Sequence, residues 1–138
     1  MKQAQKIIGR RMMLIAANPE KHAAFILQLR LQERKSRYLS GQPPSVAEQI
    51  AWMQARERLA DDAYFVICEV GTPDTPLGTI RLHDVIPEEH SIRVSSWVMA
   101  DGVAPKKTLE ALALALEYAI HAGYPNCHYE VHKNTPTT

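Results

Sequence analysis

The fold is decided by residues 91–132, which read SIRVSSWVMADGVAPKKTLEALALALEYAIHAGYPNCHYEVH. The first part of this stretch is β-prone and predicts a strand over 91–99. The middle part is apolar almost all round, which predicts a helix over about 105–122 that is buried on most sides and ends at Gly123. Residues 127–132 then form a last strand. A strand, a buried helix and another strand make a right-handed crossover, so we expect the two strands to be parallel.

The chain before residue 91 supplies the rest of the sheet. Residues 63–70 and 77–86 are strongly β-prone, and short turns join them to the strand over 91–99 as an antiparallel meander. Alternation places two sets of side chains on opposite faces of that third strand. One set is Ile92, Val94, Ser96 and Val98, and the other is Arg93, Ser95, Trp97 and Met99.

The N-terminal part predicts a strand and two helices. Residues 7–17 are rich in Ile, Met and Leu and predict the first strand. Asn18 and Pro19 are typical of the start of a helix. The sequence from Ser45 to Glu48 is a capping box, in which the two side chains bond free backbone N–H groups at the start of a second helix. The predicted fold class is therefore α/β (α+β), a mixed sheet in a single domain over 1–138.

Composition limits the possible functions. The 138 residues, of which 46% are hydrophobic, make one domain and contain no apolar stretch of the ~18–20 residues that a membrane span needs. The 16 Lys and Arg residues nearly balance the 15 Asp and Glu residues, which gives no broad positive surface for duplex nucleic acid. Cys68 and Cys127 are interpreted as reduced, buried thiols of a cytoplasmic protein. We expect no nucleic-acid partner, no membrane partner and no targeting segment.

The turn between the strand over 91–99 and the following helix is the best candidate for a ligand site. Its residues include Val103, Ala104, Lys106, Lys107 and Thr108. A helix N-terminus presents unpaired N–H groups and a partial positive charge, so it attracts anions. Two lysines in the first turn are unfavourable for the helix unless a polyanion such as a pyrophosphate neutralises them. The alternative is that both lysines are simply solvated.

A second group of polar residues lies on the last predicted strand. His128, Glu130 and His132 alternate on one face of it, with neighbouring members roughly 7 Å apart. Such a set can hold a metal ion, but we favour a polar face toward a cleft or solvent and expect no metal, because no further ligand is placed by the sequence. A carboxylate between two imidazoles also suits a general base.

Eight short segments carry a resemblance to a known family. They are LR at 29–30, RYL at 37–39, QIAW at 49–52, YFVI at 64–67, LGTIRL at 77–82, SWV at 96–98, EAL at 110–112 and YEV at 129–131. In this order, and with this order of strands and helices, the chain resembles the GNAT superfamily of acetyl-CoA-dependent N-acetyltransferases. It is closest to the branch that acetylates ribosomal proteins and amino sugars. The resemblance implies a GNAT-like mixed sheet with helices on both faces.

The resemblance also implies roles for individual residues. Acetyl-CoA, the co-substrate, would lie between the two parallel strands. Backbone groups of Val98 and Met99 would bind its pantetheine arm, and the turn over 103–108 would bind its pyrophosphate. Glu130 matches the family position that acts as general base, and Asn134 resembles the Asn that follows the same strand. We therefore expect an N-acetyltransferase with Glu130 as its catalytic residue.

The acceptor and the partners follow from two departures from the family pattern. The turn over 103–108 has a proline and no glycine, which resembles some amino-sugar relatives and favours a small-molecule amine, such as a nucleotide-linked amino sugar. Two alternatives are a protein N-terminal acetyltransferase and a catalytically silent module that binds acyl-CoA or dimerises. The family continues beyond the strand over 127–132 with a helix and two strands, so we expect the free edge of that strand to pair in a homodimer.

Overall fold

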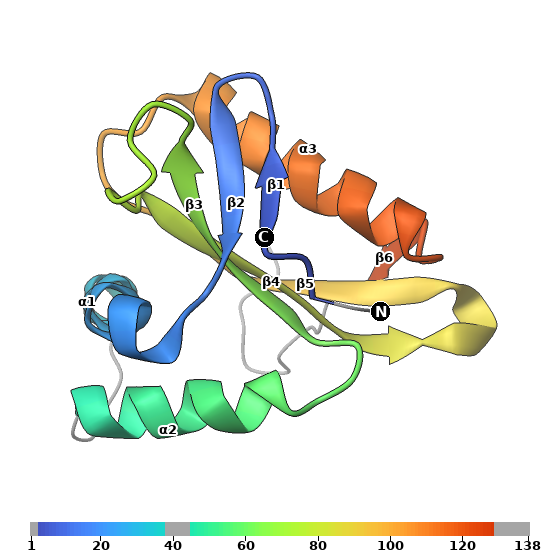
Figure 1. The fold of residues 1–138 in the computed structure, drawn as a ribbon, viewed down its shortest axis with the longest axis horizontal. Helices are drawn as coiled ribbons and strands as arrows, with labels where there is room; N and C mark the ends of the chain where they lie inside the picture. Colours follow the sequence, from blue (N-terminus) through green and yellow to red (C-terminus); the bar gives the residue numbers. More distant parts are fainter. Residues whose placement is uncertain (1–2, 38–44, 129–138) are drawn as a thin grey trace.

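A sheet with helices on both faces forms the described part of the protein (Figure 1). The computed structural model describes residues 3–37 and 45–128. In chain order the elements are β1 (Lys6–Ile8), β2 (Met12–Ala16), α1 (Pro19–Arg37), α2 (Val46–Glu57), β3 (Ala63–Glu69), β4 (Gly78–Ile86), the 3-10 helix η1 (Pro87–Glu89), β5 (Ser91–Met99), α3 (Pro105–His121) and β6 (Asn126–His128). The helices α1 and α2 cover one face of the sheet, and α3 covers the other. The predicted α/β fold class is confirmed.

The strands lie side by side in chain order from β1 to β6. Neighbouring strands are antiparallel up to β5, so β3, β4 and β5 form the predicted meander. The last pair is parallel, with Ser91–Arg93 of β5 opposite Asn126–His128 of β6. Parallel neighbours need a crossover connection, and α3 supplies it. The prediction of a parallel pair joined by a helix is confirmed.

The N-terminal segment forms a hairpin, so the prediction of one strand over 7–17 is wrong. Strands β1 and β2 pair antiparallel on either side of a tight turn. Gly9 stands at this turn, where an added Cβ would lie 2.8 Å from the Met12 carbonyl oxygen and 2.8 Å from Glu110 Oε2. The apolar residues on both sides of the turn read as one strand because each half is itself β-prone. The missing side chain at Gly9 lets the chain fold back.

The carboxylate of Glu110 on α3 holds the hairpin in place. Its Oε2 accepts hydrogen bonds from the backbone N–H groups of Arg11 and Met12, both at 2.8 Å. Burial raises the pKa of Glu110, but the hydrogen bonds from the backbone of Met12, Arg11 and Arg10 outweigh it, so the pKa lies below its ordinary value. A charge-assisted contact therefore joins the helix to the first two strands.

The sheet separates two layers of buried side chains. The layer under α3 contains Phe65 and Ile92, and the layer under α1 and α2 contains Val66 and Cys68. Successive residues of β3 thus serve opposite layers, as the pleat requires. Burial raises the pKa of the Cys68 thiol to about 11, in agreement with an inert buried cysteine. Cys127 is exposed, so the prediction of two buried thiols is wrong for that residue.

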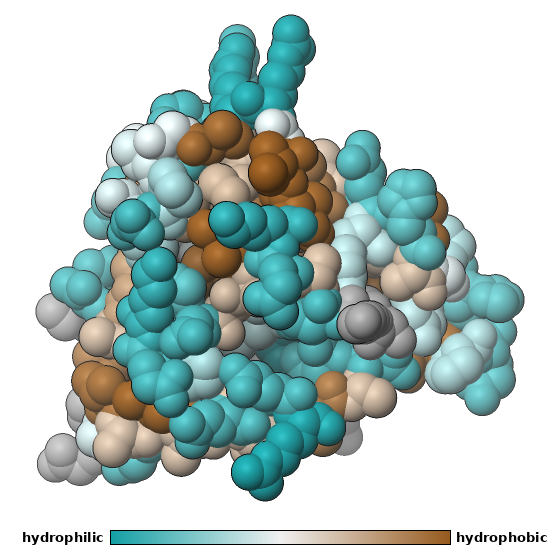
Figure 2. Space-filling view, in the orientation of Figure 1, coloured by the Kyte–Doolittle hydropathy of each residue, from teal (hydrophilic) through white to brown (hydrophobic). Residues whose placement is uncertain are grey.

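Helix α3 buries one stripe only, so the prediction that it is buried on most sides is wrong. The stripe consists of Ala111, Leu114, Ala115 and Ala119. Leu109 and Ile120 on other sides of the helix are 60% and 53% exposed. A helix on one face of a sheet contacts the sheet along one stripe, whatever its composition. Figure 2 shows hydrophobic side chains gathered over the upper ends of the first strands and α3, in agreement with the exposure of Ile8 and Leu109. Within the described ranges, no helix combines the length and the apolar character that a membrane span requires.

The β4–β5 ladder contains two bulges, each with a residue in the left-handed region. Asp84 in β4 has φ 51°, and Ser96 in β5 has φ 50°. A bulge adds a residue to one strand and reverses the alternation of faces beyond it. Met99 therefore packs with the layer under α3, which also contains Ile92 and Val94. The predicted alternation placed Met99 on the opposite face and is wrong beyond Ser96.

Replacing Glu110 by Gln should destabilise the protein at neutral pH. The amide keeps the size of the side chain but lacks the negative charge that strengthens the two hydrogen bonds from backbone N–H groups. This loss lowers the free energy of unfolding by about 1–2 kcal/mol. A carboxyl group whose pKa is lower in the folded state stabilises the folded protein fully at a pH above its pKa in the unfolded chain, about 4.3. This stabilisation is lost as the pH falls through the pKa of the folded state. Thermal melting of both proteins from pH 7 to pH 3 should show a gap of a few degrees that closes in acid.

Glu117→Gln is the matched control, because Glu117 is an exposed glutamate on the same helix. Its melting temperature should follow that of the parent at every pH. A Glu110→Gln protein as stable as the parent at pH 7 would show that the carboxylate contributes nothing to the hairpin.

Candidate active site

The C-terminal half of β5 has a strand partner on one side only within the described ranges. The ladder with β6 stops at Arg93, whereas the ladder with β4 continues to Met99. The next residue, Ala100, still donates its N–H to the Leu77 carbonyl oxygen at 2.7 Å. Residues 94–99 form the end of β5, which leads into the turn before α3. The predicted pantetheine-binding residues Val98 and Met99 lie on this stretch.

Gly78 on β4 allows the end of β5 to approach closely. An added Cβ at Gly78 would lie 2.5 Å from the Met99 sulfur and 2.6 Å from the Val98 carbonyl oxygen. Contacts this short would force the backbone of β5 to move, because the carbonyl belongs to the main chain. The position of Val98 and Met99 thus depends on a glycine that the sequence pattern did not single out.

The N-terminus of α3 follows this strand end and carries no side-chain cap. Ala104 is the N-cap residue, Pro105 stands at the first helical position, and no acidic residue occupies the first turn. The Ala104 carbonyl oxygen accepts from the N–H groups of Lys107 and Thr108 at 3.0 and 3.2 Å. Gly102, with φ 85°, makes the turn that leads into the helix. An uncapped helix start with a free positive end fits an anionic ligand such as a pyrophosphate.

The two lysines of this turn differ in their surroundings. Lys107 Nζ forms an ion pair with Glu69 Oε1 at 2.8 Å, and both side chains are partly buried. Lys106 is exposed. A carboxylate of β3 therefore already offsets the charge of Lys107, a partner that neither a bound polyanion nor solvation of both lysines anticipated. Lys106, which is exposed, stays a predicted contact of a bound anion.

The predicted histidine and carboxylate face of the last strand is described only at its first member. His128 Nδ1 lies 2.6 Å from the hydroxyl oxygen of Ser91, the residue that opens β5. Glu130, His132 and Asn134 lie outside the described residues, so their predicted roles stay predictions. Among the residues that are described, no group of three His, Cys, Asp or Glu side chains is placed to hold a metal ion.

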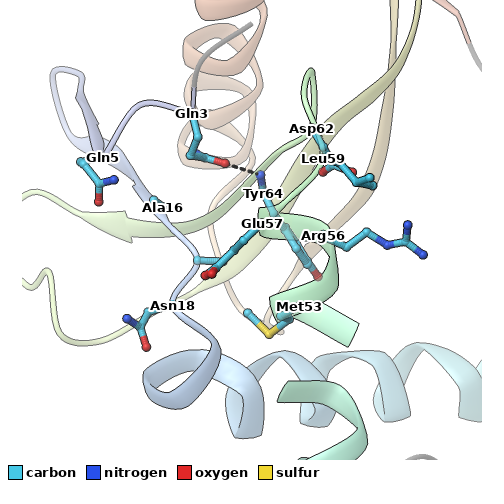
Figure 3. Close-up of a pocket in the computed structure, with 11 residues that line it drawn as sticks. Gln3, Gln5, Ala16, Asn18, Met53, Arg56, Glu57, Leu59, Asp62 and Tyr64 are labelled. Atoms are coloured by element: carbon cyan, nitrogen blue, oxygen red, sulfur yellow. Dashed lines mark hydrogen bonds between the residues drawn. The ribbon is translucent and has the colours of Figure 1, made fainter. Parts of the chain in front are cut away.

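A cavity in the described part of the chain lies away from these residues. It has a volume of about 410 Å³ and is lined by residues of the N-terminal segment, the C-terminal half of α2 and the start of β3. Figure 3 shows its wall, where Gln3 Oε1 accepts from the backbone N–H of Tyr64 at 3.0 Å, and Met53 and Glu57 also line the cavity. None of the predicted site residues lines this cavity, so its size alone does not make it the active site.

A smaller cavity lies beside the end of β5. It has a volume of about 130 Å³ and is lined by Ala100 together with Phe25, Gln28, Leu29 and Gln32 of α1. It therefore joins the strand end to the second half of α1. This contact could not be predicted from the sequence, because the charged second half of α1 is typical of a solvated helix end.

Three comparisons with known proteins bear on this arrangement. The model of the acetyltransferase (GNAT) domain family matches residues 11–136. The chain belongs to this family. The predicted resemblance is thus confirmed, the protein is an acyltransferase of the GNAT type, and acetyl-CoA is its co-substrate. A comparison with curated proteins gave no significant match.

Solved GNAT structures share the fold. The apo form of FdhC, a nucleotide-linked sugar GNAT, has a TM-score of 0.75 and 25% identity, with 90% of this chain and 71% of that chain covered. A probable acetyltransferase of Chromobacterium violaceum has a TM-score of 0.74 and 20% identity, with 93% and 67% covered. RimL, a ribosomal L7/L12 alpha-N-protein acetyltransferase in complex with coenzyme A, has a TM-score of 0.67 and 15% identity, with 86% and 69% covered. The last two likenesses show the fold alone.

Replacing Gly78 by Ala should destabilise the protein and displace the end of β5. The added methyl group meets main-chain and sulfur atoms that cannot both move aside, and overpacking of this kind costs about 1–3 kcal/mol. Urea unfolding measures the loss. The matched control is Gly71→Ala, because a Cβ at Gly71 meets no atom within 4 Å. Equal midpoints for the two variants would contradict the close approach.

Proposed function

We propose that the protein transfers the acetyl group of acetyl-CoA to a primary amine of a nucleotide-linked amino sugar. The observation that carries the cofactor part is the end of β5 at Met99, which leads directly into the uncapped N-terminus of α3. The backbone of Val98 and Met99 is available to the pantetheine arm. The N–H groups of Val103, Ala104 and Lys106, together with the Lys106 side chain, are proposed to bind the pyrophosphate, since those of Lys107 and Thr108 donate to Ala104. The thioester then lies farther back along β5.

Three residues have different roles in the proposed site. Lys107 contributes less to the pyrophosphate site than Lys106, because Glu69 pairs with it. Glu130 is proposed to accept a proton from the attacking amine, and Asn134 to contact the cofactor after the same strand. Both proposals rest on the match of YEV at 129–131 and the following sequence to the family pattern.

The similarity to FdhC supports the amino-sugar acceptor, since that protein is a nucleotide-linked sugar GNAT at 25% identity. The likeness to RimL supports a protein N-terminus as the second candidate, but at 15% identity. An acceptor screen with acetyl-CoA, read by release of the free thiol, separates the two. We expect turnover with nucleotide-linked amino sugars and none with peptides. Turnover with peptides alone would replace the acceptor, and no turnover with any amine would favour the silent acyl-CoA-binding module.

Self-association through β6 is a further part of the proposal. Within the described ranges β6 is the last strand of the sheet and pairs with β5 alone. An open strand edge favours pairing with a second copy across a two-fold axis. Light scattering measures the oligomeric state directly, and a homodimer is the expected result.

Acetyl-CoA should raise the melting temperature of the protein. A ligand at 100 times its dissociation constant adds about 2.7 kcal/mol, which is a shift of several degrees for a domain of this size. Lys106→Glu should reduce the shift, because it reverses the charge at the anion site, while a carboxylate at a helix N-terminus does not harm the fold. Lys6→Glu is the control, since Lys6 is exposed on β1. An undiminished shift in Lys106→Glu would place the pyrophosphate elsewhere.

A further inference from the structure

Three polar side chains of β4 and β5 form a connected chain outside the cofactor end. His83 Nε2 lies 2.6 Å from the hydroxyl oxygen of Ser95, and His83 Nδ1 lies 3.2 Å from Asp84 Oδ1. The other carboxylate oxygen of Asp84 pairs with Arg93 Nη1 at 2.8 Å. The order is hydroxyl, imidazole, carboxylate. An imidazole placed between a hydroxyl and a carboxylate is an arrangement that moves protons.

The backbone is distorted in the way that this contact requires. Neighbours on a strand point to opposite faces, so an aspartate directly after His83 ordinarily points away from it. The bulge at Asp84, with φ 51°, turns the carboxylate back to the imidazole. Aspartate and asparagine tolerate this conformation better than most residues, yet it still costs free energy. Bulges and left-handed residues of this kind concentrate beside active sites, where they redirect a side chain.

The chain of side chains lies on the face of the sheet opposite to α3. Toward α3, the strand is packed with core residues that include Ile92 and Val94. Ser95 lies on the other face, is only partly buried, and precedes Val98 by three residues, about 10 Å along the strand. In the proposed position the cofactor runs from the N-terminus of α3 past Val98 and back along β5. Its thioester would then approach Ser95, and the acceptor amine would enter from the side of Ser95.

The surroundings of His83 keep its imidazole neutral. Its side chain is 7% exposed, and burial is the main reason why its pKa is lowered from the ordinary value. The guanidinium of Arg81, also on β4, lowers the pKa further, while the carboxylates of Asp84 and of Asp62, which precedes β3, raise it by less. Arg93 of β5 faces the same group through Asp84. With the proton on Nδ1, directed at Asp84, Nε2 is free to accept another; this tautomer is assigned from the partners of the ring.

We propose that Ser95 and His83, with Asp84 as the positioning residue, form a proton relay that accepts a proton from the amine during acetyl transfer. This inference rests on the proposed acetyl transfer. The amine nitrogen forms a bond to the thioester carbon, and the carbon–sulfur bond breaks with its electron pair on sulfur. The proton leaves nitrogen for Ser95 Oγ as the hydroxyl proton passes to His83 Nε2. An ammonium group loses two protons when it becomes an amide, so a base at Glu130 does not make the relay redundant.

Substitutions of His83 and Ser95 test the relay, and the serine–histidine pair Ser91–His128 provides the matched control. His83→Gln and Ser95→Ala should each lower kcat about 10²- to 10⁴-fold. The KM for acetyl-CoA and the thermal shift that it causes should stay within twofold of the parent. Ser91→Ala is the control: Ser91 lies on the same strand and is also 2.6 Å from a histidine, His128. Its kcat should stay within twofold.

The pH dependence separates a relay from a merely structural contact. The rate falls in acid when His83 becomes protonated, and Asp84 raises the pKa of His83. Asp84→Asn keeps the size and tolerates the left-handed backbone, so it should fold, and it should move the acid limb of the kcat profile to lower pH. ¹⁵N NMR of the imidazoles in the protein without substrate should show the same downward shift for His83 and a proton on Nδ1.

The outcomes distinguish a failure of the relay from a failure of the proposed acetyl transfer. A normal acetyl-CoA thermal shift together with undiminished kcat in folded His83→Gln and Ser95→Ala overturns the relay and leaves the acetyl transfer intact. An acid limb that does not move in Asp84→Asn overturns the role of Asp84. A parent protein that shows neither thermal shift nor turnover overturns the acetyl transfer and the relay with it.

Discussion

The pairing of β5 with β4 from Ser91 to Met99 is the constraint on which the rest of the site depends. The close approach of β4 and β5 at Gly78 holds the end of β5, and the chain passes from Met99 into the uncapped N-terminus of α3. A ligand with an extended arm and an anionic end, such as acetyl-CoA, fits a strand end that leads to a helix N-terminus. The cofactor site proposed for this GNAT domain therefore consists largely of main-chain groups.

The fit of α3 fixes where that helix begins. Its apolar stripe packs on the sheet, and the Glu110 carboxylate bonds the turn between β1 and β2. At the same end, Glu69 of β3 pairs with Lys107 and attaches the first turn of the helix to the sheet. Two carboxylate contacts and one packed stripe therefore hold the helix start beside Met99. These contacts, and no glycine-rich loop, position the proposed anion site.

The face of the sheet under α1 and α2 carries the polar chemistry. Tyr64 and Val66 of β3 belong to this layer. On the neighbouring strand β4, the same face carries the buried polar side chains of Arg81 and His83. Arg81 is satisfied by Asp62, and its guanidinium lies 5.1 Å from the centre of the Trp52 ring. His83 instead bonds Ser95 in the C-terminal half of β5. Because Arg81 is paired with Asp62, its role is structural. The His83 imidazole can exchange a proton with Ser95, beside the proposed position of the thioester.

Periodicity and breakers in the sequence determined the meander, the helix over 105–121 and the parallel β5–β6 pair, because apolar runs separated by glycine and proline depend on local preferences. The turn at 103–108 was equally visible, since it joins two such runs. Only the tertiary structure decided the pairing of Lys107 with Glu69, the exposure of Cys127, and the contact of His83 with Ser95 and Asp84. The ion pair and the exposure of Cys127 depend on how segments distant in the sequence pack together, which no local pattern records. For His83 the physical reason is the bulges, because each adds one residue to one strand and reverses the faces on which later side chains lie.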